Sequence, residues 1–254
     1  MGSFVPEIMA LRVVLSIAML CYASYRDVKT REVSDAVWIL FGGIGVLING
    51  YAIISGTLIW NTLLIAVGFS AIFSLLTGYL GFFGGADILA FIVISFLNPV
   101  TPQVGFNLIL FRPLLFPLSV ITNSVLIAAS SVFVVLVVNI ATTRNHFEGY
   151  TPTSPFTKII LLLTGRRKEI CNVKGPPFEY PLEKINEDGS VSLFIRSNFL
   201  DDKAASDTFY ELKSRGKSHV WVSYGLPFLL FLTIGFFSAL ILGDFTLWIV
   251  SRFI

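Results

Sequence analysis

Charged residues are scarce in this chain of 254 residues. Only 13% are Asp, Glu, Lys or Arg, whereas a soluble domain carries roughly a quarter. Hydrophobic residues make up 55%, and the mean hydropathy is +0.80. The net charge of +2 is too small to favour nucleic-acid binding, so no nucleic-acid partner is expected. The composition instead predicts that a lipid bilayer surrounds much of the chain.

Cysteine and histidine are also sparse, with two of each. Cys21 lies in an apolar run and Cys171 in a polar segment, and no CxxC pair exists. A structural zinc site is therefore not expected. His146 and His219 do not form a metal site by themselves, so we expect neither a metal nor a cofactor.

Apolar runs predict an all-α polytopic membrane protein with six transmembrane helices, since about 20 residues cross a bilayer. The expected spans are 9–25, 36–55, 58–80, 86–97, 118–140 and 222–242. The run 86–97 is short for a full crossing. Four prolines punctuate the stretch before the fifth span, which favours an interfacial or re-entrant connection: Pro99, Pro102, Pro113 and Pro117.

Residues 142–220 differ in composition, holding twelve of the 18 Lys and Arg residues and ten of the 16 acids. They predict a small α+β cytoplasmic domain inserted between helices five and six. The expected division is a membrane domain over 1–141, this soluble domain over 142–220, and the sixth helix with the C-terminus over 221–254. Segments 179–185 and 191–196 predict a hairpin, 219–222 another strand, and 156–163 a short amphipathic helix.

The distribution of basic residues predicts the orientation, because Lys and Arg concentrate in cytoplasmic loops. Arg26, Lys29 and Arg31 follow the first span, and the basic residues of 142–220 follow the fifth. With six spans these loops share one side. We therefore expect a multi-pass plasma-membrane protein with both termini outside and the soluble domain in the cytoplasm.

Two aspartates then fall on the cytoplasmic side. Asp27 ends the first span and Asp87 begins the fourth, and the two spans between them make a round trip. An acid near a membrane span is a functional candidate by default. Each also has a simpler explanation: Asp27 as a solvated loop acid, and Asp87 as an anion favoured by a helix start. Asp35 after Ser34 is explained by helix capping, and Asp244 falls on the outer side.

Gly84 and Gly85 precede Asp87, and glycines there allow unusual dihedral angles and close backbone approach. Two acids on two helices that face one compartment, one of them behind a glycine loop, are a stronger signal than either acid alone. Carboxylates in membrane helices are also typical of proton- or ion-coupled transporters, so transport is an alternative function. A non-catalytic scaffold protein is a third interpretation.

The sequence resembles the GxGD membrane aspartyl proteases, and among them the archaeal preflagellin peptidases, which are related to prepilin peptidases. The resemblance lies in Asp27 within 25–35, in Gly84-Gly85-Ala86-Asp87, and in the proline-containing segment 225–228. Ala86 departs from a strict GxGD motif and is similar to the Gly-x-hydrophobic-Asp variant of preflagellin peptidases.

The resemblance implies an aspartic endopeptidase in which Asp27 and Asp87 activate a water. Its expected substrates are preflagellin- or prepilin-like proteins, from which it would cleave short basic leader peptides at the cytoplasmic membrane boundary. Residues Gly84, Gly85 and Ala86 would form the loop along which the substrate approaches. Two carboxylates that share such a site hold one proton between them.

Overall fold

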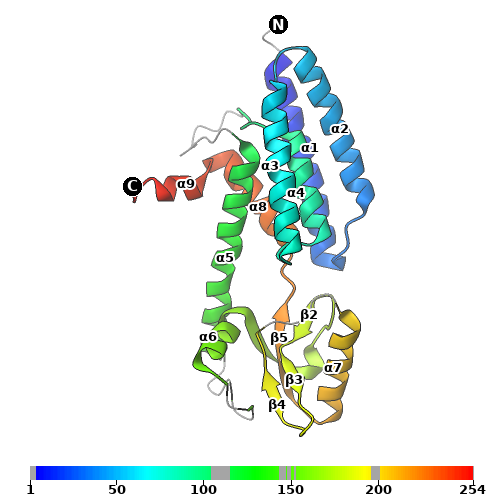
Figure 1. The fold of residues 1–254 in the computed structure, drawn as a ribbon, viewed down its shortest axis with the longest axis vertical. Coiled ribbons are helices and arrows are strands. Elements are labelled where there is room, and N and C mark those ends of the chain that lie inside the picture. Colours follow the sequence, from blue (N-terminus) through cyan, green and yellow to red (C-terminus); the bar gives the residue numbers. More distant parts are fainter. Residues whose placement is uncertain are drawn as a thin grey trace. The chain divides into compact units, whose positions relative to one another are not determined.

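A computed structural model describes residues 4–103, 115–142, 147, 150–151, 153–195 and 201–253. The chain forms two compact units, Met1–Ala128 with Pro227–Ile254, and Ala129–Leu226. Figure 1 shows helices throughout the first unit and a small sheet in the second. The chain is thus mostly helical, with a sheet-containing region in its C-terminal half.

The first unit is built from apolar helices. They are α1 (Phe4–Thr30), α2 (Asp35–Ile54), α3 (Trp60–Tyr79), α4 (Gly85–Leu97), the first part of α5 (Phe116–Thr142), α8 (Phe228–Leu242) and α9 (Phe245–Val250). Helices α1 to α4 run alternately up and down beside one another (Figure 1). On α2, the side chains of Ile39, Leu47 and Ile54 are 75–89% exposed. Exposed apolar side chains of this size indicate a surface that faces lipid.

Four helices in the described part of the chain are long and apolar enough to cross a membrane: α1, α2, α3 and α5. The predicted fourth span corresponds to α4, which has 13 residues, and the sixth to α8, which has 15. The predicted start of the sixth span at Val222 is wrong. That residue belongs to strand β5 (His219–Tyr224), whose β-branched and aromatic residues pair with strands on both sides.

The short helix α4 lies inside the first unit. Ala90, Phe91, Ile94 and Leu97 are all 0% exposed, and the helix packs against α1, α2, α3 and α8. A helix that is apolar on every side and enclosed by neighbours needs no lipid contact of its own. Ser95 on α4 hydrogen-bonds to Ser70 on α3, a polar contact typical of packed membrane helices.

The second unit contains the remaining elements. They are the end of α5, then α6 (Pro155–Thr164), β1 (Gly165–Glu169), η1 (Ile170–Asn172), β2 (Glu179–Pro181), β3 (Glu183–Ile185), β4 (Val191–Leu193), α7 (Asp202–Ser214) and β5. Strands β1, β5 and β2 form an antiparallel sheet in that order, and β3 pairs with β4. The predicted hairpin and amphipathic helix are confirmed by β3–β4 and α6. Strand β1 and helix α7 were not predicted.

The core of this unit follows the two-residue period of β5. Val220 and Val222 pack with Leu212 of α7, whereas Trp221 packs with Leu161 and Leu182. The predicted strand 179–185 is divided into β2 and β3. At the break, the backbone N–H of Leu182 donates to the carbonyl of Trp221 at 2.9 Å.

Candidate active site

Asp27 lies in the last turn of α1 and is held by the residue that ends the helix. Arg31 adopts a left-handed backbone conformation, with φ of 59°, and its N–H donates to the Asp27 carbonyl at 3.0 Å. Glycine is the usual residue at such a helix end, because any Cβ is strained there. This turn brings the Arg31 guanidinium to 3.8 Å from the Asp27 carboxylate, with only 16% and 15% of the two side chains exposed.

The start of α8 is a second partner of Asp27. The backbone of Leu229, in the first turn of α8, hydrogen-bonds to the Asp27 carboxylate. Free N–H groups and the helix dipole make a helix N-terminus attractive to an anion. Ser24, one turn before Asp27, donates to the Leu229 carbonyl at 2.9 Å and contacts the Thr233 hydroxyl at 2.6 Å. These bonds fix the start of α8 against the end of α1.

Asp87 occupies the third position of α4 and closes the turn that begins the helix. Its carboxylate accepts a hydrogen bond from the N–H of Gly84 at 2.9 Å, which is half of a capping box. Asp87 therefore stabilises the start of α4 in addition to any chemical role. The helix N-terminus also favours its negative charge.

The structure brings the two aspartates together at one end of the first unit. Asp87 interacts electrostatically with both Asp27 and Arg31. Figure 1 shows why: α1 runs toward this end, whereas α4 and α8 begin there. The predicted placement of both carboxylates at the same end of the helices thus agrees with the geometry.

The glycine loop before Asp87 differs from expectation in its backbone. Neither Gly84, with φ of −77°, nor Gly85, which is helical, needs a conformation reserved for glycine; Gly81, with φ of 77°, does. What Gly85 provides is space, since a Cβ built there would meet nothing within 4 Å. Both Gly84 and Gly85 are exposed, whereas Ala86 is partly buried against the core. The loop therefore leaves room for another backbone beside Asp87.

An aromatic contact joins this loop to α8. The rings of Phe83 and Phe228 lie 4.6 Å apart between centroids, so the loop and the start of α8 pack together beside the aspartates. Sequence reasoning missed three features of the site: the left-handed Arg31, the α8 N-terminus and this ring pair. Only the segment 225–228 gave a signal, through its proline directly before an apolar run.

The other acids near helix ends have structural roles. Asp35 lies in the first turn of α2, which Ser34 caps as predicted, through a 3.4 Å bond from the N–H of Ala36. Asp244 follows α8 at the end remote from Asp27 and is fully buried. It caps α9 by accepting the N–H of Leu247 at 2.8 Å, and the Thr122 hydroxyl donates to it.

No group of three or more His, Cys, Asp or Glu side chains that could hold a metal occurs among the described residues. At the end of the first unit that holds Asp27 and Asp87, the structure places two carboxylates, one guanidinium and the N-termini of two helices.

Comparison with known proteins identifies the family. Residues 14–138 match the type IV leader peptidase family, and residues 157–245 match the archaeal peptidase A24 C-terminus, type II. The preflagellin peptidase of Methanococcus maripaludis strain C6 is 25% identical over 233 residues, which is 89% of this chain and 92% of that protein. The chain therefore belongs to the prepilin and preflagellin (type IV leader) peptidase family, and it is a membrane protease that cleaves leader peptides.

Proposed function

We propose that this leader peptidase is an aspartic endopeptidase in which Asp27 and Asp87 together activate a water molecule. The observation that carries the proposal is that Asp27, at the end of α1, and Asp87, at the start of α4, lie at the same end of the first unit, where Arg31 pairs with Asp27 at 3.8 Å and acts electrostatically on Asp87. Both aspartates are only partly exposed, which strengthens electrostatic interactions between them while leaving them accessible to water.

The proposed mechanism divides the work between the two carboxylates. Two carboxylates that share a site do not both ionise cheaply, so the proposed pair holds one proton. The ionised carboxylate takes a proton from water as that water attacks the scissile carbonyl. The protonated carboxylate donates its proton to the carbonyl oxygen, which gives a tetrahedral diol. The other carboxylate then passes the proton that it took from water to the leaving amine as the C–N bond breaks, and the first carboxylate takes back a proton from a diol hydroxyl as the new carboxyl group forms. Asp87, favoured as an anion by the start of α4, is assigned the role of base.

The proposed substrates are preflagellin- or prepilin-like proteins with short basic leaders. A site at the ends of the helices, away from their middles, suits cleavage where a leader meets a hydrophobic helix. The scissile segment must be extended to expose its carbonyl. The open space at Gly85 supports an approach of the substrate backbone along residues 84–86, beside Asp87.

Glu183 of the second unit is an acid whose partners prevent it from binding a basic leader. Glu183 is 1% exposed and is bonded to Tyr150, Lys217 and the N–H of Trp221. Burial, with Glu183 beside it, raises the pKa of Tyr150, so this tyrosine stays a neutral donor. A carboxylate engaged in this way is not available to a basic leader.

The topology proposed with this function has six spans, in which α4 and α8 cross the membrane inside the helix bundle. The division into 1–141, 142–220 and 221–254 follows from that topology, with the polar segment and both aspartates in the cytoplasm. The basic residues after α1 and in 142–220 support this orientation.

A cleavage assay tests the mechanism. Purified full-length protein is given a substrate with a basic leader that ends in glycine, and initial rates of leader release are measured. Asp27→Asn and Asp87→Asn should each lower the rate by at least about 10²- to 10⁴-fold, the range for loss of a general acid or base. Asp35→Asn and Asp244→Asn are matched controls that remove one acid elsewhere, and they should retain activity.

The outcome separates the proposed chemistry from its alternatives. Full activity in either Asp27→Asn or Asp87→Asn would remove that residue from the mechanism. A large loss in the Asp35 or Asp244 variant, in folded protein, would mean that other acids do the work. A transporter or scaffold would show no leader release from the wild type at all.

A further inference from the structure

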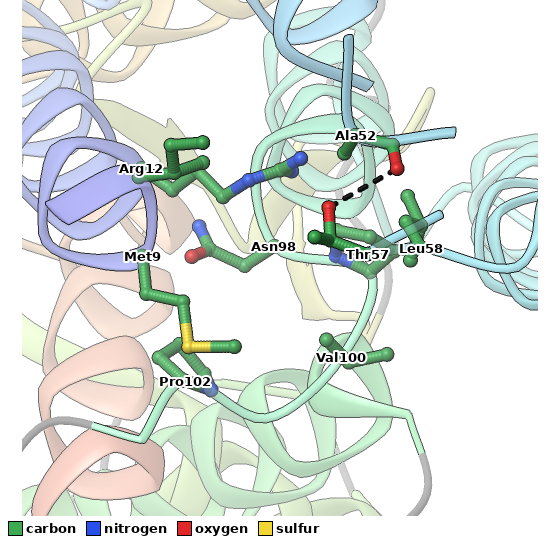
Figure 2. Close-up of a pocket in the computed structure, with 10 residues that line it drawn as sticks. Met9, Arg12, Ala52, Thr57, Leu58, Asn98, Val100 and Pro102 are labelled. Atoms are coloured by element: carbon green, nitrogen blue, oxygen red, sulfur yellow. Dashed lines mark hydrogen bonds between the residues drawn. The ribbon is translucent and has the colours of Figure 1, made fainter. Parts of the chain in front are cut away.

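A cavity lies at the other end of the first unit, remote from the aspartates. It is lined by α1, by the α2–α3 connection and by the segment that follows α4, and Figure 2 shows Arg12, Met9, Thr57 and Asn98 around it. Arg12 precedes Asp27 by fifteen residues on the same helix, which is roughly 22 Å along α1. The two sites are therefore distinct.

Among the described residues that line this cavity, Arg12 is the one that carries a charge, and it is buried, with 7% of its surface exposed. Its guanidinium donates to the carbonyls of Leu97, at 2.8 Å, and Phe96, at 3.4 Å, at the C-terminus of α4. The helix dipole there offsets part of the positive charge. Within the described ranges no carboxylate pairs with Arg12, and no acceptor takes its remaining N–H groups.

A buried charge without a counter-ion is costly, commonly by several kcal/mol, so the arrangement is incomplete without an anion or water. Asn98 points to the same conclusion. It is 1% exposed, its amide nitrogen donates to Ser16 at 2.6 Å, and its Oδ1 is buried with no hydrogen-bond partner among the residues that the structure describes. Asn98, with an unpartnered oxygen, and Arg12, with unused donors, thus both belong to the lining of one cavity.

The rest of the lining is apolar and includes Ile8, Met9, Leu58 and Val100. A planar guanidinium with free N–H groups matches the oxygens of a phosphate, and a protonated or hydroxyl-bearing head group also satisfies Asn98. Apolar walls at the end of membrane helices suit acyl chains. Water alone would solvate the polar groups and leave this apolar rim unexplained.

We propose that this cavity binds the phosphate head group of a membrane phospholipid, in the leaflet opposite the aspartates, with Arg12 as the phosphate ligand. The lipid would neutralise the guanidinium and hold together the start of α1, the α2–α3 connection and the end of α4. This inference depends on the membrane setting of the chain and is independent of the proposed peptidase mechanism.

Native mass spectrometry of the full-length protein tests the proposal, because it counts lipids retained after detergent removal. The probes are phosphatidylglycerol, diacylglycerol with the same acyl chains, and inorganic phosphate. We expect one tightly held phosphatidylglycerol per chain and at least tenfold weaker retention of diacylglycerol. Arg12→Gln should weaken phosphatidylglycerol binding about tenfold to a hundredfold, the range for lost charge-assisted hydrogen bonds. The affinity of Arg12→Lys for phosphatidylglycerol should lie between those of the wild type and Arg12→Gln.

Arg252→Gln is the matched control, since Arg252 is an exposed basic residue that stacks on Trp248 outside the cavity. It should bind phosphatidylglycerol like the wild type. If Arg12→Gln fails to fold, as judged by circular dichroism and gel filtration, Val100→Trp fills the cavity without changing its charge and should also abolish binding.

Three results would overturn the assignment. Equal retention of diacylglycerol would show that the head group is not recognised. Unchanged phosphatidylglycerol binding in folded Arg12→Gln, or in Val100→Trp, would place the lipid elsewhere. If inorganic phosphate binds through Arg12 and displaces the lipid, the cavity is a site for free phosphate and the phospholipid assignment is wrong.

Discussion

Replacing Gly85 by alanine should impair leader cleavage without harming the fold. Gly85 is the first residue of α4, is exposed, and has an ordinary helical backbone. A Cβ at this position would meet nothing within 4 Å in the free protein. Alanine in a helix is more stable than glycine by up to about 0.5–1 kcal/mol, so the variant should be as stable as the wild type or slightly more so.

The expected functional loss comes from the substrate. If the scissile segment lies along residues 84–86, the added methyl group displaces it from Asp87 by about the radius of one carbon atom. A misplacement of about 1 Å from reactive groups costs on the order of 10²-fold in rate. We therefore expect kcat/KM for leader cleavage to fall by about tenfold to a hundredfold.

The assay compares initial cleavage rates with thermal unfolding of the same preparations. Gly43→Ala is the matched control, because Gly43 is also exposed and helical and also has no atom within 4 Å of a built Cβ, but it lies on α2 away from the aspartates. Wild-type cleavage by Gly85→Ala would refute the proposed path of the substrate. A loss of stability in Gly85→Ala would refute the claim that the space is empty.

Two further predictions concern charge and packing. Arg31→Gln should lower kcat about tenfold with a smaller change in KM, because it removes the cation that pairs with Asp27 and acts electrostatically on Asp87. Arg31→Lys should restore part of the rate. Equal losses in both variants would assign the effect to the backbone turn. Gly235→Ala should lower the free energy of unfolding by about 2–3 kcal/mol or more, because the added methyl group overpacks the helix contact. A Cβ at this position would lie 2.7 Å from the backbone N of Ser124 and 2.8 Å from the Val120 carbonyl oxygen. Thermal unfolding measures the loss. A variant as stable as Gly43→Ala would contradict that close approach of α5 and α8.

The amino-acid sequence predicts that the two aspartates lie at the same end of the helices, because this depends only on whether the number of membrane crossings between them is even or odd. An even number of crossings between Asp27 and Asp87 returns the chain to the same side, whatever the tilt or length of each helix. The parity of the crossings does not change with the exact end of a helix, so the extension of α1 to Thr30, beyond the expected residue 25, leaves the expected side of Asp27 the same. Helix boundaries were less predictable, since frayed or extended ends depend on tertiary contacts.

The elements that sequence reasoning missed in the second unit fall into two kinds. Strand β1, Gly165–Glu169, has three consecutive basic residues and no apolar alternation, so only its pairing with β5 makes it a strand. Helix α7 was recognisable: Asp201 is placed to cap it, and Ala205, Phe209 and Leu212 recur at helical spacing. The capping residue and the apolar spacing are both visible in the amino-acid sequence itself.

The left-handed turn at Arg31 was not predictable by any pattern, because arginine is rarely found there. Its presence argues for a specific role. A glycine would end α1 with less strain, but it would leave the carboxylates without their nearest cation. The strain, of roughly 1–2 kcal/mol, is comparable to the strength of a partly buried ion pair, so the turn is tolerable only where the side chain has a partner.

Charge balance explains why the site lies at helix ends. It also explains why the site combines α1 and α4, which precede the second unit in the sequence, with α8, which follows it. Arg31 pairs with Asp27 and acts electrostatically on Asp87, and each helix N-terminus adds the equivalent of about half a positive charge. Helix α4 supplies one such terminus to Asp87, and α8 supplies the other to Asp27 through Leu229. Without α8, Asp27 would meet only the negative end of its own helix and Arg31. Because α8 follows the second unit, Ala129–Leu226, the site draws on segments from both sides of that unit in the sequence.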